Sequence, residues 1–253
     1  MSVAIDWQHA IQQLESGEIR AATRQADGHW QTNVAVKQAI LAAFRAGENQ
    51  VCTGQYGGFI DKHNLPARHF TLEDQVRMVP GGSAVRAGAY VAPSVIIMPP
   101  AYVNIGAYID SGTMVDSHAL VGSCAQIGKR VHLSAGVQIG GVLEPVGMTP
   151  VVLEDDVFVG AGSVIVEGII VRQRAVIAPG VMLSKAVPVY DCVHECMRER
   201  GAEIPENAVV VPGTRPIQQT WAQSQGLQLQ CPVIIKYRDE KSDASLVLED
   251  SLR

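Results

Sequence analysis

A strict six-residue spacing of aliphatic side chains is the feature that most constrains this chain. A branched aliphatic residue recurs every six positions, interrupted once by a ten-residue loop at 141–150, and a small or slender residue stands two positions before each one. The aliphatic positions are Val85, Val91, Ile97, Val103, Ile109, Val115, Val121, Ile127, Leu133, Ile139, Leu153, Val159, Ile165, Val171, Ile177, Leu183 and Val189. A period of six matches neither the helical 3.6 nor the alternation of an isolated strand. It predicts a parallel β-helix, with one short strand per repeat.

The residue types follow from the narrow interior of such a solenoid. Each strand points one aliphatic and one small side chain inward, and a large residue at both positions would overfill the core at a cost of about 1–3 kcal/mol. Three strands complete one coil, so 18 residues advance the chain by about 4.8 Å. Between Ser83 and Val189 the pattern predicts five to six coils. The exposed strand edges at both ends need caps.

The segments on either side of the repeat read differently. We expect residues 1–75 to form a small helical cap packed on the first coil, with Asp6 and Asn33 beginning its two helices and a tight turn at Asp27-Gly28 between them. Residues 50–74, rich in Gly and Pro, are expected to be a connector. The β-helix is predicted over 76–213, with an insertion at about 190–203 followed by one more partial repeat. Residues 214–253 are predicted to contain a short β-rich segment, 227–237, and a charged tail.

Charge, apolar runs and cysteine usage indicate which partners and which compartment to expect. The net charge is −5 without a basic tract, which argues against nucleic acid as a partner. No apolar run has the roughly 18–20 residues of a membrane span, and the N-terminus does not resemble a signal sequence. Five cysteines without a framework spacing suit a reducing compartment. These features predict a cytoplasmic protein that contacts neither membrane nor nucleic acid.

The segment 104–128, NIGAYIDSGTMVDSHALVGSCAQIG, carries the most specific motifs, followed by VHLS at 131–134 and GGVLEP at 140–145. In these motifs, in the cap and in Ile234-Ile235-Lys236, the chain resembles the tetrahydrodipicolinate N-succinyltransferases over essentially its whole length. The resemblance implies a left-handed β-helix that assembles into a homotrimer with active sites between subunits. It also implies transfer of a succinyl group from succinyl-CoA to the amine of 2-amino-6-oxopimelate (tetrahydrodipicolinate), in the lysine and diaminopimelate pathway.

The same resemblance implies roles for particular residues. Asp116 is expected to face the substrate as an acid or base, since amine attack on a thioester requires loss of an ammonium proton. Arg77, and less directly Arg86, are expected to pair with substrate carboxylates. Ser123 and Gly141 are expected to contribute hydroxyl and backbone contacts to substrate. The alternatives are a turn-capping Asp116, solvated arginines and a plain loop glycine at 141.

Part of the family's pattern is altered. The family stretch Gly-Ala-Arg-Ser-Glu reads Gly-Ala-Gly-Ser-Val here, so Gly162 and Val164 replace an arginine and a glutamate. The stretch near the expected CoA site also differs, and Ala161, Gly162 and Lys185 are the residues expected to contact CoA. Two alternatives to the succinyltransferase therefore stand. One is a paralogue that acylates a related amino dicarboxylate, with acetyl-CoA as the donor, in a specialised pathway such as biosynthesis of a tabtoxin-like β-lactam. The other is a non-catalytic scaffold.

No metal is predicted. Cys192-x-His194-x-Cys196 fits no common zinc spacing, and His118 and His132 lack a third histidine at a neighbouring coil position. Cys124 is expected to be a packed small residue rather than a nucleophile. The chain has no phosphate-binding P-loop or dinucleotide fingerprint. The resemblance implies that a CoA thioester is held by backbone groups along a coil edge.

Overall fold

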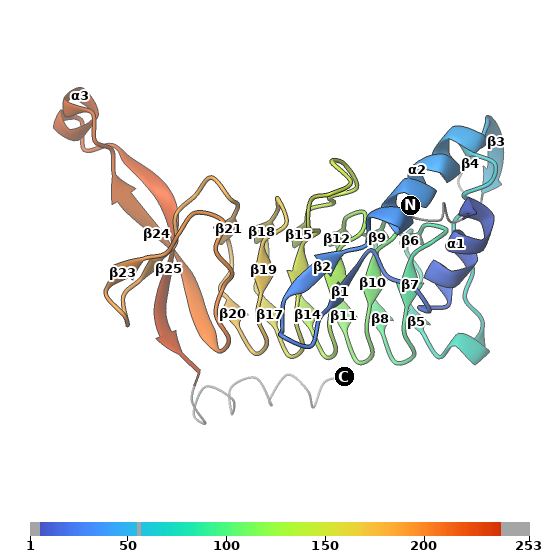
Figure 1. The fold of residues 1–253 in the computed structure, drawn as a ribbon, viewed down its shortest axis with the longest axis horizontal. Helices are drawn as coiled ribbons and strands as arrows, with labels where there is room; N and C mark the ends of the chain where they lie inside the picture. Colours follow the sequence, from blue (N-terminus) through green and yellow to red (C-terminus); the bar gives the residue numbers. More distant parts are fainter. Residues whose placement is uncertain (1–5, 55–56, 239–253) are drawn as a thin grey trace.

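The computed structural model describes residues 6–54 and 57–238 and shows the expected solenoid, a triangular prism of short parallel strands (Figure 1). Face 1 consists of β7 (Tyr90–Val91), β10 (Tyr108–Ile109), β13 (Gln126–Ile127), β16 (Val152–Leu153) and β19 (Ile170–Val171). Face 2 consists of β5 (Arg77–Met78), β8 (Ile96–Ile97), β11 (Met114–Val115), β14 (His132–Leu133), β17 (Phe158–Val159), β20 (Val176–Ile177) and β24 (Ala208–Pro216). Face 3 consists of β6 (Ala84–Val85), β9 (Tyr102–Val103), β12 (Leu120–Val121), β15 (Gln138–Ile139), β18 (Val164–Ile165) and β21 (Met182–Leu183).

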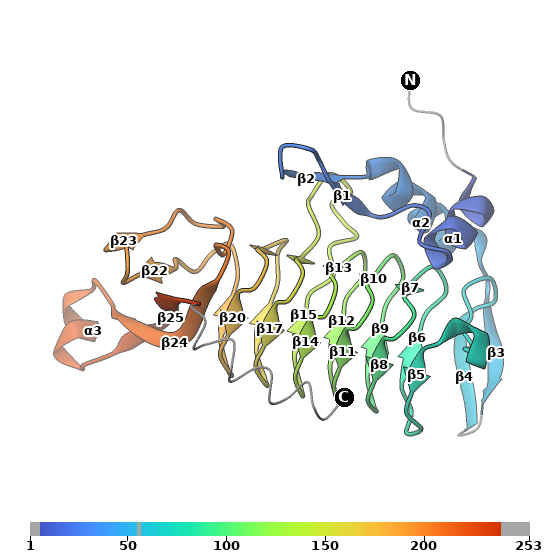
Figure 2. The same cartoon turned by 90° about the horizontal axis from the view of Figure 1, so that it is seen from below.

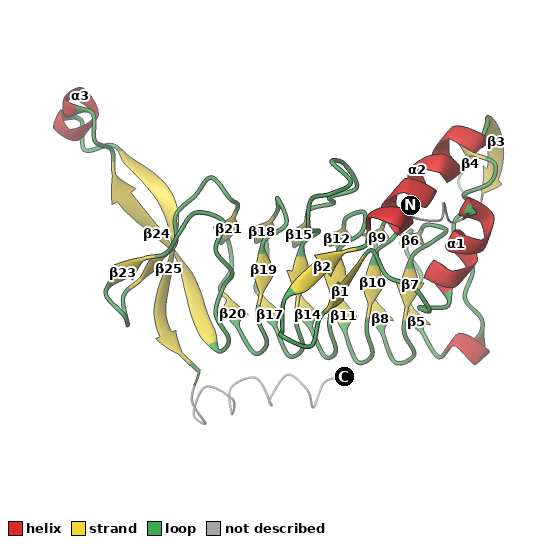
Figure 3. Cartoon of the chain, viewed as in Figure 1, coloured by secondary structure: helices red, strands yellow, loops and turns green. Residues whose placement is uncertain are grey.

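The register confirms one coil per three repeats. Ile109 pairs with Ile127, 18 residues later, while Ile127 pairs with Leu153, because the 141–150 loop is accommodated outside the coil. The aliphatic position of every hexad is buried, and these side chains form one continuous core along the prism. Short strands alternate with turns throughout (Figure 3), so three corners run the length of the molecule. The corner between faces 1 and 2 follows β10, β13, β16 and β19.

The N-terminal cap has the predicted elements. Helix α1 (Trp7–Glu15) begins at Asp6, whose side chain accepts from the His9 N–H, and α2 (Val34–Ala46) begins at Asn33 in the same way. Between them β1 (Ala22–Arg24) and β2 (Trp30–Thr32) pair antiparallel around the expected turn. No helix among the described residues has the length and apolar character needed to cross a bilayer.

The position of the cap differs from the prediction. Instead of sitting only on the first coil, it lies along face 1 (Figure 2): Ile40 of α2 packs with Ile105 and Cys124, and Trp30 packs with Val152 and Ile170 much further along the solenoid. The hexad shows which residues point inward but not which outer face the cap covers.

The predicted connector at 50–74 was also wrong in part. Strands β3 (Asn49–Gly54) and β4 (Gly57–Lys62) form an antiparallel hairpin, and a 3-10 turn, η1 (Leu72–Asp74), follows. Val51 and Phe59 of this hairpin are largely exposed. Its glycines suggested a loop, but here they stand at the facing ends of paired strands.

The C-terminal part extends face 2. The insertion forms the hairpin β22 (Tyr190–Asp191) and β23 (Cys196–Met197), and the expected partial repeat follows, with Ile204 bridging to Val171 and Val210 pairing with Ile177. Strand β24 runs through the predicted domain boundary at 213 and pairs antiparallel with β25 (Gln228–Tyr237), with helix α3 (Thr220–Ser224) at the tip of this ribbon (Figure 1). The predicted tail beyond residue 238 lies outside the described residues.

Candidate active site

Asp116 lies on the corner between faces 2 and 3, in the turn after β11. Its backbone N–H donates to the Leu133 carbonyl at 2.9 Å, and its Oδ1 accepts the Ser117 N–H at 2.6 Å. The side chain therefore caps its own turn with one oxygen, as the turn-capping alternative predicts. Within the described residues, Oδ2 has no hydrogen-bond partner, and the residue is half-buried. One carboxylate oxygen is thus held in place while the other is free to accept a proton or a hydrogen bond.

Ser123 and Gly141 meet on a different corner, between faces 3 and 1. The Val142 N–H donates to the Ser123 carbonyl at 3.0 Å, which draws the start of the 141–150 loop onto the preceding coil. A Cβ on Gly141 would lie 2.5 Å from the Ser123 backbone nitrogen, so only glycine permits this close approach. Gly141 is therefore required by backbone packing. Ser123 and Gly141 therefore lie side by side, and their backbone groups could contact a ligand at this corner.

The residues expected to contact CoA are divided between these two corners. Ala161 and Gly162 are exposed in the turn after β17, on the same corner as Asp116 but two coils further along. A Cβ added to Gly162 would meet no atom within 4 Å, so this turn leaves open space. Lys185 is exposed on the Ser123 corner, where its backbone N–H donates to Glu167 at 2.8 Å.

The two arginines have different environments. Arg77 is exposed on β5, at the beginning of face 2, and no described residue pairs with its side chain. Arg86, by contrast, donates to both carboxylate oxygens of Asp61 at 2.7 Å and lies 5.0 Å from the centroid of the Phe44 ring. The Arg86–Asp61 pair attaches the β3–β4 hairpin to the first coil. Arg77 is therefore the better placed of the two to receive a substrate carboxylate.

Within one chain the predicted site residues do not converge. Face 3 separates Asp116, Ala161 and Gly162 from the Ser123 corner. Its outward side chains are mostly apolar: Ala84, Tyr102, Leu120, Gln138, Val164 and Met182. Val164, at the family's glutamate position, stands between Gln138 and Met182 on neighbouring coils. The predicted site residues of one chain therefore lie on separate corners of the prism.

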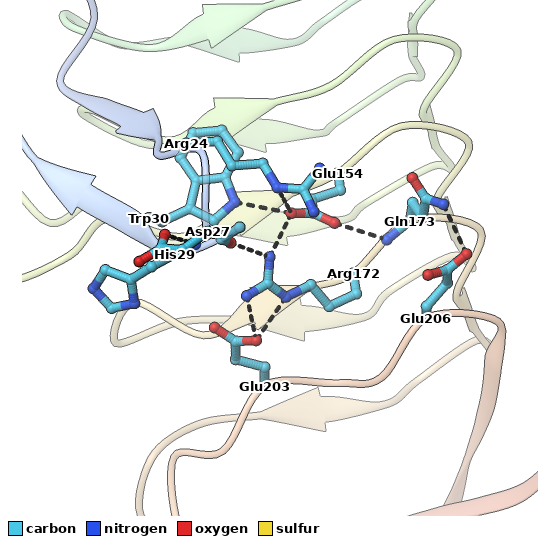
Figure 4. Close-up of polar contacts among 10 residues, drawn as sticks. Arg24, Asp27, His29, Trp30, Glu154, Arg172, Gln173, Glu203 and Glu206 are labelled. Atoms are coloured by element: carbon cyan, nitrogen blue, oxygen red, sulfur yellow. Dashed lines mark hydrogen bonds and ion pairs between the residues drawn. The ribbon is translucent and has the colours of Figure 1, made fainter.

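Sequence reasoning missed a buried polar cluster between the cap and the corner of faces 1 and 2 (Figure 4). Glu154, with only 6% of its side chain exposed, accepts from Trp30 Nε1 at 2.9 Å and from Arg172 Nη1 at 2.7 Å. Arg172 also binds Glu203 and donates to the Gly28 carbonyl at 2.8 Å. A signal was present: Glu154 and Arg172 occupy the same turn position of successive coils, directly after the inward aliphatic residue. Asp110 has this position two coils before Glu154, with Gly128 on the coil between them.

A second missed cluster joins the insertion to β25. Asp191 is buried and accepts from Tyr237 Oη at 2.6 Å and from His194 Nδ1 at 2.9 Å. Burial opposes ionisation of Asp191, but these bonds and two backbone N–H groups lower its pKa to about 2. The same contact, with burial as the larger cause, raises the pKa of Tyr237 to about 12. The cluster anchors the insertion and lies far from the Asp116 corner.

Cys124 shows no sign of nucleophilic activation. Burial raises the pKa of Cys124 to about 12, so its thiol stays protonated and acts as a packed side chain, as predicted. All five cysteines are free. In residues 6–54 and 57–238, no group of three or more His, Cys, Asp or Glu side chains is placed to hold a metal ion.

The hexad, the three parallel faces and the polar corners together define a left-handed parallel β-helix of the hexapeptide-repeat type. The family model described as hexapeptide repeat of succinyl-transferase matches residues 150–185, and the one described as tetrahydrodipicolinate N-succinyltransferase N-terminal matches residues 4–46. The chain belongs to the tetrahydrodipicolinate N-succinyltransferase family, which confirms the resemblance inferred from the motifs.

Membership rests on similarity over nearly the full chain. A relative from Nitrosococcus oceani, named 2,3,4,5-tetrahydropyridine-2,6-dicarboxylate N-succinyltransferase, is 45% identical over 97% of this chain and 88% of its own length. Relatives of the same name from Nitrobacter hamburgensis and Bartonella quintana are 42% and 44% identical, with the same coverage of both chains.

Proposed function

We propose that this protein is a CoA-dependent N-acyltransferase that moves a succinyl group from succinyl-CoA to the amine of an acyclic amino dicarboxylate, the ring-opened form of tetrahydrodipicolinate. The similarity over nearly the whole length of curated N-succinyltransferases is the observation that carries this proposal. The carboxylate of Asp116 supports the proposal, because its Oδ2 has no hydrogen-bond partner among the described residues and could accept the proton that the amine must lose. The five free cysteines suit the reducing cytoplasm, where we expect the enzyme to act.

In the proposed reaction, the amine nitrogen attacks the thioester carbonyl carbon, the C–S bond breaks, and CoA leaves as the thiolate. The attacking nitrogen must lose a proton, and Oδ2 of Asp116 would accept it while Oδ1 stays on the Ser117 N–H. Arg77 would pair with an acceptor carboxylate, and the backbone at Ser123 and Gly141 would hold the substrate. Gly162, Ala161 and Lys185 would line the CoA edge.

The active site is proposed to form between subunits of a homotrimer. The half-sites of one chain lie on corners that face 3 separates, and the outward side chains of faces 2 and 3 are largely apolar, with Tyr102 and Met182 well exposed. Packing those faces against neighbouring copies would bury them and bring the Asp116 corner of one copy to the Ser123 corner of the next.

The decisive assay measures thiol release from succinyl-CoA and from acetyl-CoA, each with and without 2-aminopimelate as acceptor. We expect acceptor-dependent turnover with succinyl-CoA, at least about 100-fold lower in Asp116→Asn, because that variant keeps the turn but cannot take up the proton. Asp156→Asn, on another corner, is the matched control and should retain full activity. Turnover with acetyl-CoA alone would indicate that Val164 and Gly162 accompany a different donor. Absence of turnover with both donors in an intact trimer would refute the proposal.

A further inference from the structure

A polar hollow of about 110 Å³ lies under the β1–β2 hairpin, on the corner between faces 1 and 2. It is distinct from the candidate active site, whose residues occupy the other two corners. Its walls carry both signs of charge, from Arg20, Asp110 and Asp155, and an apolar surface from Trp30. Arg24 and Glu154 border both this hollow and a wider opening toward His29 and Glu206, shown in part in Figure 4.

Arg20 is a desolvated cation without a direct counter-ion. Its Nε donates to Gln126 at 2.9 Å, and its guanidinium stacks on the Tyr108 ring at 3.6 Å from the centroid. No carboxylate of the described residues lies within ion-pair distance of it. Burial lowers its pKa, and the fields of Tyr108, Asp110 and Asp155 offset only part of this effect. An anionic group entering the hollow would find the terminal guanidinium nitrogens available.

Asp110 and Asp155 each use only one of their two carboxylate oxygens in a hydrogen bond to the described residues. Asp110 Oδ1 accepts the Ser111 N–H at 2.7 Å, and Asp155 Oδ1 accepts the Lys129 N–H at 2.9 Å. Neither Oδ2 has a hydrogen-bond partner within the part of the chain that the structure describes. Both carboxylates influence Arg130, but its guanidinium is taken up by a two-point contact with Asp156 at 2.7 and 2.8 Å.

The charge balance selects the ligand. Arg24 and Arg172 already bind Glu154, and Arg172 also binds Glu203, so those charges compensate one another. The remaining unpaired groups are one guanidinium and two carboxylates. A simple anion would be repelled by the two aspartates, and a simple amine would be repelled by Arg20. One carboxylate and two ammonium groups on a methylene chain would satisfy all three, with the methylenes against Trp30.

We propose that this hollow binds a basic α-amino acid, a diamino monocarboxylate with net charge +1. Its carboxylate lies on Arg20, and its ammonium groups lie on Asp110 and Asp155. Because the hairpin β1–β2 forms one wall, the bound molecule also holds the cap against face 1. The site is complete within one chain and does not depend on the proposed acyl transfer.

Calorimetric titration of the full-length protein tests this without any turnover. L-lysine and L-ornithine should bind, while norleucine, which lacks the second ammonium, and cadaverine, which lacks the carboxylate, should bind at least about tenfold more weakly. Asp110→Asn keeps the Ser111 contact and should weaken lysine binding about tenfold or more. Glu73→Gln, an exposed carboxylate of η1 that does not line the hollow, is the control and should bind lysine normally.

Three results would overturn the proposal: no heat from any probe at about 10 mM, equal affinity for lysine, norleucine and cadaverine, or unchanged lysine binding in Asp110→Asn. Thermal unfolding of each variant, without ligand, distinguishes a lost contact from a lost fold. Trp30 provides a second readout, since its fluorescence should change when lysine binds and stay constant with cadaverine.

Discussion

Replacing Glu154 with glutamine tests whether the buried polar cluster holds the cap on the β-helix. Glu154 is 6% exposed and accepts from Trp30, Arg172 and the Gln173 N–H, and it also pairs with Arg24 at 3.3 Å. Removing one partner of a buried ion pair costs about 3–5 kcal/mol. Arg172 retains Glu203 and the Gly28 carbonyl in the variant, so we expect about 2–3 kcal/mol.

The matched control is Asp156→Asn. Its pair with Arg130 has equally good geometry but is exposed, 55% for the arginine and 37% for the aspartate, so the loss should stay below about 1 kcal/mol. Urea unfolding at one fixed protein concentration measures both losses. Hydrogen exchange at residues 22–32 shows whether the hairpin opens first. Equal losses in the two variants, or unchanged exchange in the hairpin of Glu154→Gln, would refute the reasoning.

Three further outcomes follow from packing and titration. Ile127→Ala, at a fully buried hexad position, should cost about 2–5 kcal/mol in urea unfolding, whereas Leu72→Ala, 98% exposed, should change stability by less than about 0.5 kcal/mol. Gly106→Ala should lower the melting temperature by several degrees, because φ is +74° and the new Cβ would lie 2.8 Å from Ile40 Cδ1; an unchanged melting temperature would contradict the close contact of α2 with face 1. Asp191 has a folded pKa of about 2, below its ordinary 3.8, so its stabilising contribution of about 2 kcal/mol is present above pH 4 and is lost as the pH falls toward 2. Asp191→Asn should flatten this part of the stability curve, and an identical pH dependence in both proteins would count against the assignment.

The hexad determined the solenoid, its inward side chains and the number of residues per coil without further information. This was possible because each inward position contacts its equivalents in the neighbouring coils, so the constraint repeats locally along the chain. The caps of α1 and α2 were predictable for a similar reason, since Asp6 and Asn33 act on N–H groups three residues away. The motifs around Asp116 were readable because they form a continuous stretch.

Tertiary structure alone decided which outer face the cap covers and which charges meet there. Trp30 and Glu154 are 124 residues apart, and Arg20 and Gln126 are 106 apart, so no local spacing links them. It also decided that Arg86 pairs with Asp61, while Asp116 and Ser123 stand on different corners. Inward residues obey a repeating steric rule, whereas outward polar residues depend on which distant segment folds over them, and that depends on the whole chain.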